Sequence, residues 1–181
     1  DPSKRQQVAL SSSNDVKNFL NKVATMPKAG AGDARLVFAL DATASRQPTW
    51  DMASRLQAEM FQTAGSLGGL SVQLSYFRGF AEFFASNWQT SSEALLSRMS
   101  RISCQAGATQ IQRLLHHVLA ENEKGRVKCV VYIGDAMEEN IDLLAQLSGK
   151  LGLLNIPLFM FQEGHDPVAR NAFIEMTRLS R

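Results

Sequence analysis

The stretch RLVFALDATAS, residues 35–45, decides the fold. Its first six residues are mostly apolar and rich in strand-forming types. A short strand that is apolar on both faces is typical of a parallel sheet covered by helices on both sides. The apolar run then ends abruptly in Asp41, and hydroxyls follow at Thr43 and Ser45. We therefore predict a buried strand whose carboxyl end carries three polar side chains.

Strands and helices alternate along most of the remaining chain. Further strands are expected at 70–77, 80–88, 125–135 and 156–164. Helices are expected at 14–26, from about 49, and at 91–102, 111–119, 141–154 and 166–181. The segment 80–88 follows a turn and is predicted to return as an antiparallel edge strand. This order predicts an α/β fold: a Rossmann-like, open, mostly parallel sheet with one antiparallel edge strand and helices on both faces.

The composition is that of a globular chain. Of 181 residues, 45% are hydrophobic and the formal net charge is +2, which predicts one domain with a substantial core. A charge this mild, without a block of Lys and Arg, argues against nucleic-acid binding. No apolar run approaches the roughly 18 residues of a membrane-spanning helix, and we expect a cytoplasmic protein. Cys104 and Cys129 match no metal-binding spacing, and a disulfide between them has little support.

Three loops are predicted to meet at one edge of the sheet. Right-handed crossovers place the strand ends that lead into helices at the same edge, where open α/β folds bind ligands. The loop DATAS contributes Asp41, Thr43 and Ser45. The loop GAT contributes Thr109, and the loop GDAMEE contributes Asp135. These are hard oxygen ligands without His or Cys, a set that suits Mg²⁺ or Mn²⁺, less strictly Ca²⁺, and not zinc.

In the order of its elements and in these three motifs, the sequence resembles the von Willebrand factor A (VWA) domain, the fold shared with integrin I domains. The metal-ion-dependent adhesion site (MIDAS) of that family combines Asp-x-Ser-x-Ser, a Thr in a Gly-containing loop, and an Asp after a later strand. Asp41, Thr43 and Ser45 match the first motif, with Thr43 in place of a serine. Thr109 matches the second motif. Asp135 matches the third, where GDA replaces the usual TDG.

The resemblance implies how such a site works. In the family, the first-loop hydroxyls bind the cation directly, the aspartates act largely through water, and a partner's Glu or Asp fills the open position. This implies a metal-ion-dependent protein-interaction module and not an enzyme, with Mg²⁺, Mn²⁺ or Ca²⁺ as cofactor and a protein partner that supplies an acidic residue. The resemblance covers roughly residues 33–181, the expected VWA-like domain. Residues 1–32 are expected to form a polar segment with a short helix and a linker.

Other interpretations stay open. A Mg²⁺-dependent phosphohydrolase of the haloacid dehalogenase type also begins with a buried strand ending in Asp. That family needs a second carboxylate two residues on, where this chain has Thr43. A structural VWA module with a non-functional site is the other alternative, because the glycine that usually follows the third motif's Asp135 is missing. Taken singly, Asp41, Thr109 and Asp135 also suit helix caps.

Several further side chains are candidates for the rim of the site. Glu138, Glu139 and His165 follow strands at the same edge, although an ordinary solvated face explains them as well. His116 and His117 lie on one predicted helix, and we expect one to be packed and the other exposed. An aromatic cluster is expected to cover the core and the sheet edge, with any exposed member forming a docking patch. This cluster comprises Phe80, Phe83, Phe84 and Trp88.

Overall fold

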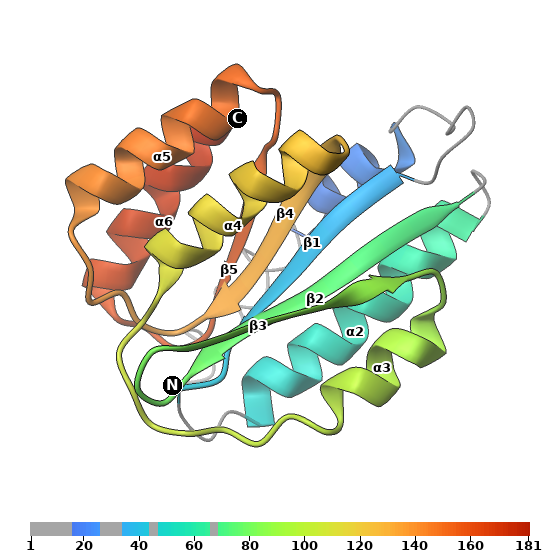
Figure 1. Ribbon diagram of the computed structural model, residues 1–181, viewed down its shortest axis with the longest axis horizontal. Coiled ribbons are helices and arrows are strands. Elements are labelled where there is room, and N and C mark those ends of the chain that lie inside the picture. The colour runs from blue at the N-terminus through green and yellow to red at the C-terminus, as the bar shows by residue number, and fades with distance from the viewer. Residues whose placement is uncertain (1–15, 26–33, 44–46, 66–68) are drawn as a thin grey trace, which may run out of the picture.

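A single sheet forms the centre of the molecule (Figure 1). The computed structural model describes residues 16–25, 34–43, 47–65 and 69–181, and within them five strands pair in the order β3-β2-β1-β4-β5. The strands are β1 (Ala34–Asp41), β2 (Leu70–Arg78), β3 (Glu82–Gln89), β4 (Val127–Gly134) and β5 (Leu158–Gln162). The pairs β1–β2, β1–β4 and β4–β5 are parallel, and β3 is an antiparallel edge strand. The predicted fold class is confirmed.

Helices cover both faces of the sheet. They are α2 (Gln47–Gly65), α3 (Ser92–Met99), α4 (Ile111–Lys124), α5 (Ile141–Leu153) and α6 (Pro167–Ser180), together with helical residues 16–24. Figure 1 shows α2 and α3 on one side of the sheet and α4, α5 and α6 on the other. No helix in the described ranges is long and apolar enough to cross a membrane.

The central strand β1 explains why the sequence is apolar on both of its faces. Leu36, Phe38 and Leu40 pack into the core shared with α2 and α3. The alternate residues Val37 and Ala39 pack into the core shared with α4, α5 and α6. Successive side chains of a strand point to opposite faces, so the middle of a strand that is covered on both sides favours apolar residues at every position.

The helical residues 16–24 belong to the same core as the sheet. The Phe19 ring is fully buried, and its centroid lies 5.0 Å from the Phe159 ring and 6.1 Å from the Phe161 ring, both in edge-on geometry. Val16 and Val23 are buried on the same helical face. The segment expected to be polar therefore carries an apolar face that packs on the sheet. The division of the chain at residue 32 stays a prediction.

We expect Phe19→Ala to lower the free energy of unfolding by about 3 kcal/mol, because it removes a fully buried aromatic ring and leaves a cavity. The measurement is urea unfolding followed by circular dichroism. The matched control is Phe80→Ala, since that ring is fully exposed and its loss should change stability by less than about 0.5 kcal/mol. Equal effects of the two substitutions would contradict the packing of helix 16–24 on the sheet.

Candidate functional site

The carboxyl ends of β1 and β4 bring two of the predicted site residues to one edge of the sheet. Asp41 is the last residue of β1, and its neighbour Leu40 is in register with Ile133 of β4. Asp135 follows directly after the last residue of β4. Since the two strands are parallel and adjacent, both carboxylates lie at the same edge. Asp41 is only 1% exposed, which is rare for an aspartate without a structural or ligand-binding role.

Asp41 organises the turn that leaves β1. Its Oδ1 accepts the backbone N–H of Thr43 at 2.8 Å and the hydroxyl of Thr43 at 2.5 Å. Such Asx turns reverse a chain over its own strand end, which is the physical reason for an Asp followed two residues later by a hydroxyl. Because the Thr43 proton is donated to Asp41, the lone pairs of its oxygen remain available as acceptors. Ser45, the third predicted ligand of this loop, lies outside the described residues.

A long irregular loop between α3 and α4 crosses the same edge. The N–H of Gln105 donates to the carbonyl of Ala42 at 3.0 Å, and the carbonyl of Gln105 accepts the N–H of Gly79 at 3.0 Å. Arg78 donates to the hydroxyl of Ser103 at 3.0 Å and also to its carbonyl. The loop that carries Thr109 is therefore tied to the ends of both β1 and β2.

Gly107 allows this loop to cross. A Cβ at this position would lie 1.9 Å from the carbonyl oxygen of Gly79, a distance that no side chain tolerates. The backbone of Gly107 is not in the left-handed region, so close approach rather than conformational freedom requires the glycine. The Gly of the GAT motif is thus explained by the packing of two backbones.

The loop after β4 is latched to the start of α4. The Oγ1 of Thr109 accepts the N–H of Glu138 at 3.2 Å. The carboxylate of Glu139 accepts the N–H groups of Ile111 at 2.7 Å and Gln112 at 2.8 Å. A carboxylate there satisfies free donors and meets the positive end of the helix dipole. Glu139 is thus a helix cap supplied from a distant loop, a role that sequence analysis missed.

These contacts correct several sequence-based interpretations. The residue before α4 is Gln110 and the N-cap of α5 is Asn140, so Thr109 and Asp135 are not the N-caps of those helices. Of the possible rim residues, Glu139 is partly buried against α4, whereas Glu138 and His165 are exposed. The expectation of one packed and one exposed histidine on α4 is confirmed.

On α4, His117 is partly buried, with its Nε2 2.7 Å from Oε1 of Gln73, and His116 is exposed. Burial lowers the pKa of the His117 imidazole.

The phenol of Tyr132 is a second feature that sequence analysis missed. It is 1% exposed, its hydroxyl has no hydrogen-bond partner among the described residues, and it lies beside the Cα of Gly134 at the edge of the sheet. Burial raises the pKa of this phenol well above its usual value. The negative charges of Asp41, Glu139 and Asp135 act on that pKa in the same direction. Three carboxylates thus place their charge around one buried O–H, so negative charge is concentrated at this edge.

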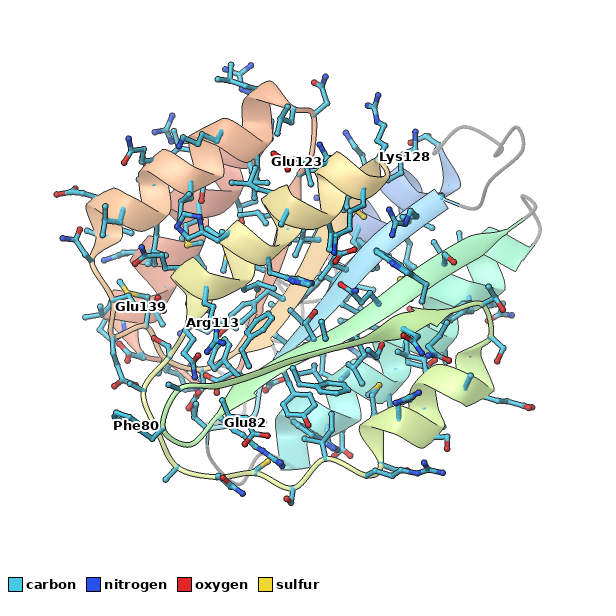
Figure 2. The ribbon with its side chains drawn as sticks, viewed as in Figure 1. Phe80, Glu82, Arg113, Glu123, Lys128 and Glu139 are labelled. Carbon is cyan, nitrogen blue, oxygen red and sulfur yellow. The ribbon has the colours of Figure 1, made fainter. Side chains whose placement is uncertain are left out.

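An open groove lies beside Thr109. It has a volume of about 700 Å³ and is lined by residues 79–81, residues 106–110 and the first turns of α4, with Glu139 at one side. Figure 2 shows Phe80 projecting from the β2–β3 turn near Arg113 and Glu139, while Glu123 and Lys128 lie at the far end of the molecule.

Two members of the predicted aromatic cluster, Phe80 and Phe84, are exposed in the structure. Phe83 and Trp88 pack on the core and Phe84 stacks on Tyr76, but Phe80 is fully exposed.

No group of three or more His, Cys, Asp or Glu side chains within the described part of the chain is arranged to hold a metal ion. Cys104 and Cys129 are both free thiols, and neither lies in such a group. A cation at the edge described above would depend on the hydroxyl oxygens of Thr43 and Thr109 together with carboxylates. Hydroxyl and carboxylate oxygens are hard donors, and they fit Mg²⁺, Mn²⁺ or Ca²⁺.

Comparison with solved structures places this architecture. The VWA domain of SpRpn10 superposes with a TM-score of 0.58 and 10% sequence identity, over 80% of this chain and 82% of that one. The chain has the von Willebrand factor A fold. A manganese-loaded TRAP protein of Plasmodium vivax has the same TM-score of 0.58 at 13% identity, over 80% of this chain. The matched region covers 62% of the length of that TRAP chain. The sequence itself matches no family model and no curated protein.

We expect Gly107→Ala to destabilise the VWA fold by about 1–3 kcal/mol, the usual cost of overpacking, because its methyl group would collide with the Gly79 carbonyl. The matched control is Gly149→Ala in α5, where an added Cβ meets nothing within 4 Å. That change should stabilise the chain by up to about 1 kcal/mol, since alanine favours a helix interior. Thermal unfolding of both variants tests the pair, and a shift of the same sign would contradict this account of the loop.

We expect Glu139→Ala to cost about 1 kcal/mol, because two N–H groups of α4 lose their acceptor and the helix loses a favourable charge. Glu139→Gln keeps one acceptor oxygen and should cost less. Glu138→Ala serves as the control, since the Glu138 side chain is exposed and its contact to Thr109 uses only the backbone N–H. Denaturant unfolding of the three variants measures the order, and an equal loss from Glu138→Ala would contradict the capping role.

Proposed function

We propose that this chain is a metal-ion-dependent protein-interaction module, in which a divalent cation at the edge of Asp41, Thr43 and Thr109 accepts a carboxylate from a partner protein. One observation supports the proposal: Asp41, buried at the carboxyl end of the central strand β1, holds the hydroxyl of Thr43 in place at that edge of the sheet. Open α/β folds bind ligands beyond the carboxyl ends of their strands. A buried polar side chain at that edge therefore favours a ligand site.

The charge at this edge supports a cation. Asp41 and Asp135 act together with Glu139 on the buried Tyr132 phenol, so the edge is negative. Part of the Glu139 charge is offset by the start of α4, whose N–H groups it accepts. Asp41 and Asp135 are the proposed carboxylates that balance a doubly charged ion at this edge. When bound, that ion would supply a directional site for one more oxygen ligand.

Some residues at this edge are proposed to bind the cation, and others orient the side chains that bind it. Thr43 and Thr109, together with Ser45, are the proposed hydroxyl ligands, and Asp41 and Asp135 the proposed carboxylates, acting directly or through water. Asp41 fixes the Thr43 hydroxyl by accepting its proton, so the oxygen lone pairs face away from Asp41. Glu138 fixes Thr109 through one backbone N–H, and one lone pair of the Thr109 oxygen remains for a ligand.

The comparisons support this proposal at the level of the fold. The TRAP structure carries manganese, and the Rpn10 structure is a VWA domain, and both superpose on this chain over 80% of its length. We propose Mg²⁺ or Mn²⁺ as the cation, with Ca²⁺ less favoured because it takes more oxygen ligands. The partner is proposed to be a protein that presents an exposed Asp or Glu.

The decisive experiment measures Mn²⁺ binding by the loss of the free-ion electron paramagnetic resonance signal. We expect the wild-type chain to bind Mn²⁺. Asp41→Ala should weaken that binding at least about tenfold, because carboxylates that orient metal ligands contribute roughly 10–100-fold. Thr43→Val keeps the shape of the side chain and removes its oxygen, so it should have the same effect.

Glu123→Ala, which removes one carboxylate at the far end of α4, is the matched control and should leave Mn²⁺ binding unchanged (Figure 2). Circular dichroism checks that each variant is folded. Absence of Mn²⁺ binding by the wild-type chain, or equal binding by Thr43→Val, would refute the proposal and favour a structural VWA module.

A further inference from the structure

The turn between β2 and β3 presents a fully exposed aromatic ring. Phe80 lies at its tip, between Gly79 and Ala81, and its side chain contacts none of the buried core (Figure 2). A phenyl ring in water forgoes roughly 1.5–3 kcal/mol of burial free energy, which a partner that covers the ring would recover. Aromatic anchors also dominate the energy of protein interfaces.

This turn is held rigidly. Arg78 and Glu82 flank it and form a bidentate pair, with Nε and Nη2 of the arginine 2.9 Å and 3.0 Å from the carboxylate oxygens. The N–H of Gly79 donates to Gln105, and the side-chain amide of Gln110 donates to the carbonyl of Glu82 at 3.1 Å. A ring displayed by a tied backbone loses little entropy when a partner covers it.

The backbone of the turn adopts the left-handed conformation on both sides of Phe80. Gly79 has φ of +56° and Ala81 has φ of +60°. A left-handed residue other than glycine costs roughly 1 kcal/mol. Arg113 of α4 offsets that cost, since its Nη1 donates to the carbonyl of Ala81 at 2.7 Å. The ring and the arginine are therefore fixed relative to each other.

Arg113 supplies a positive charge beside the same turn. It is exposed, and it forms no ion pair with a carboxylate of the described residues. Nη1 is used by Ala81 and by the Gln110 side chain, while Nε and Nη2 keep their donors free of any such bond to the described chain. An arginine fork with free donors is suited to a carboxylate.

The groove connects these two residues to Thr109. All three line the same hollow of about 700 Å³, whose lining also includes the small residues at 106–108. Glu139 also lines it, but its carboxylate is occupied by the first N–H groups of α4. The groove therefore combines the apolar ring of Phe80, the positive charge of Arg113 and the small side chains at 106–108.

From these contacts we infer that the groove between Phe80 and Arg113 binds an acidic segment of a partner protein, which places an apolar side chain on Phe80 and a carboxylate on Arg113. An acidic segment is proposed because the positive charge of Arg113 complements a carboxylate. The inference deepens the proposed function, because the same segment would present its other carboxylate at the Thr109 end of the groove. It assigns to the partner two acidic residues with an apolar residue near them.

The test is selection from a library of random peptides displayed on phage, with the folded chain as bait and Mn²⁺ present. We expect enriched peptides to carry two acidic residues and one aromatic or aliphatic residue at a constant spacing. Selected peptides are then synthesised, and their affinities for the variants are measured by fluorescence anisotropy. Phe80→Ser should lower affinity roughly tenfold or more, the effect of losing an interface anchor.

Arg113 is tested by reversing and by removing its charge. Arg113→Glu should lower the affinity at least about tenfold and, as bait, should select a basic residue in place of one acid. Arg113→Gln keeps a donor for the Ala81 carbonyl, so its loss of affinity reports the charge and not the turn. Two controls are used. Leu153→Ser removes an exposed apolar side chain at the last residue of α5, and Arg126→Glu reverses an exposed charge just before β4; both should leave the affinity unchanged.

The outcomes separate this inference from the cation site. If Mn²⁺ binds but the enriched peptides lack an acid that responds to Arg113→Glu, the groove inference is wrong and the proposed function stands. If no Mn²⁺ binds and the same peptides are enriched in EDTA, the groove inference stands alone. Self-association in sedimentation that disappears in Phe80→Ser, without peptide enrichment, overturns the inference in favour of a second copy of this chain.

Discussion

The backbone of Gln105 joins the parts of the molecule on which the candidate site depends. Its N–H donates to the carbonyl of Ala42 after β1, and its carbonyl accepts the N–H of Gly79 after β2, so one residue joins two strand ends. Main-chain bonds of this kind depend on no particular side chain at position 105. They require instead that the crossing loop lie very close to the turn, which Gly107 permits. Everything else at this edge is arranged around that crossing.

Much of the fold could be predicted because its signals are local. The apolar run of β1 has no polar face, and the helix at 111–124 repeats its apolar residues with helical spacing, so both indicate burial directly. Phe80 shows where this reasoning fails. It precedes a strand rich in aromatic residues, and nothing in the pattern distinguishes it from Phe83, which packs on the core. Its exposure follows from backbone ties to Gln105 and Arg113, which are distant in the sequence.

For the candidate site, residues close in the sequence and residues at strand ends could be placed, but contacts between distant loops could not. Asp41 and Thr43 are two residues apart, so a local turn brings them together. Thr109 and Asp135 could be assigned to the same edge from the order of strands and helices alone. The capping of α4 by Glu139 joins residues 27 and 28 positions apart and replaces an ordinary N-cap, so no short motif announces it. In the sequence, Tyr132 looks like one more apolar residue of a buried strand. Only the structure shows that its hydroxyl is buried without a hydrogen-bond partner among the described residues.

The exposed ring of Phe80 also bears on the behaviour of concentrated solutions. A formal net charge of +2 on 181 residues gives neighbouring molecules little electrostatic repulsion. Contact between two such rings would also bring together the paired charges of Arg78 and Glu82, which flank the turn. The dispersion of the chain therefore depends on charges immediately beside the ring rather than on the total charge. The exposed ring thus links the solution behaviour of the chain to a single residue of the β2–β3 turn.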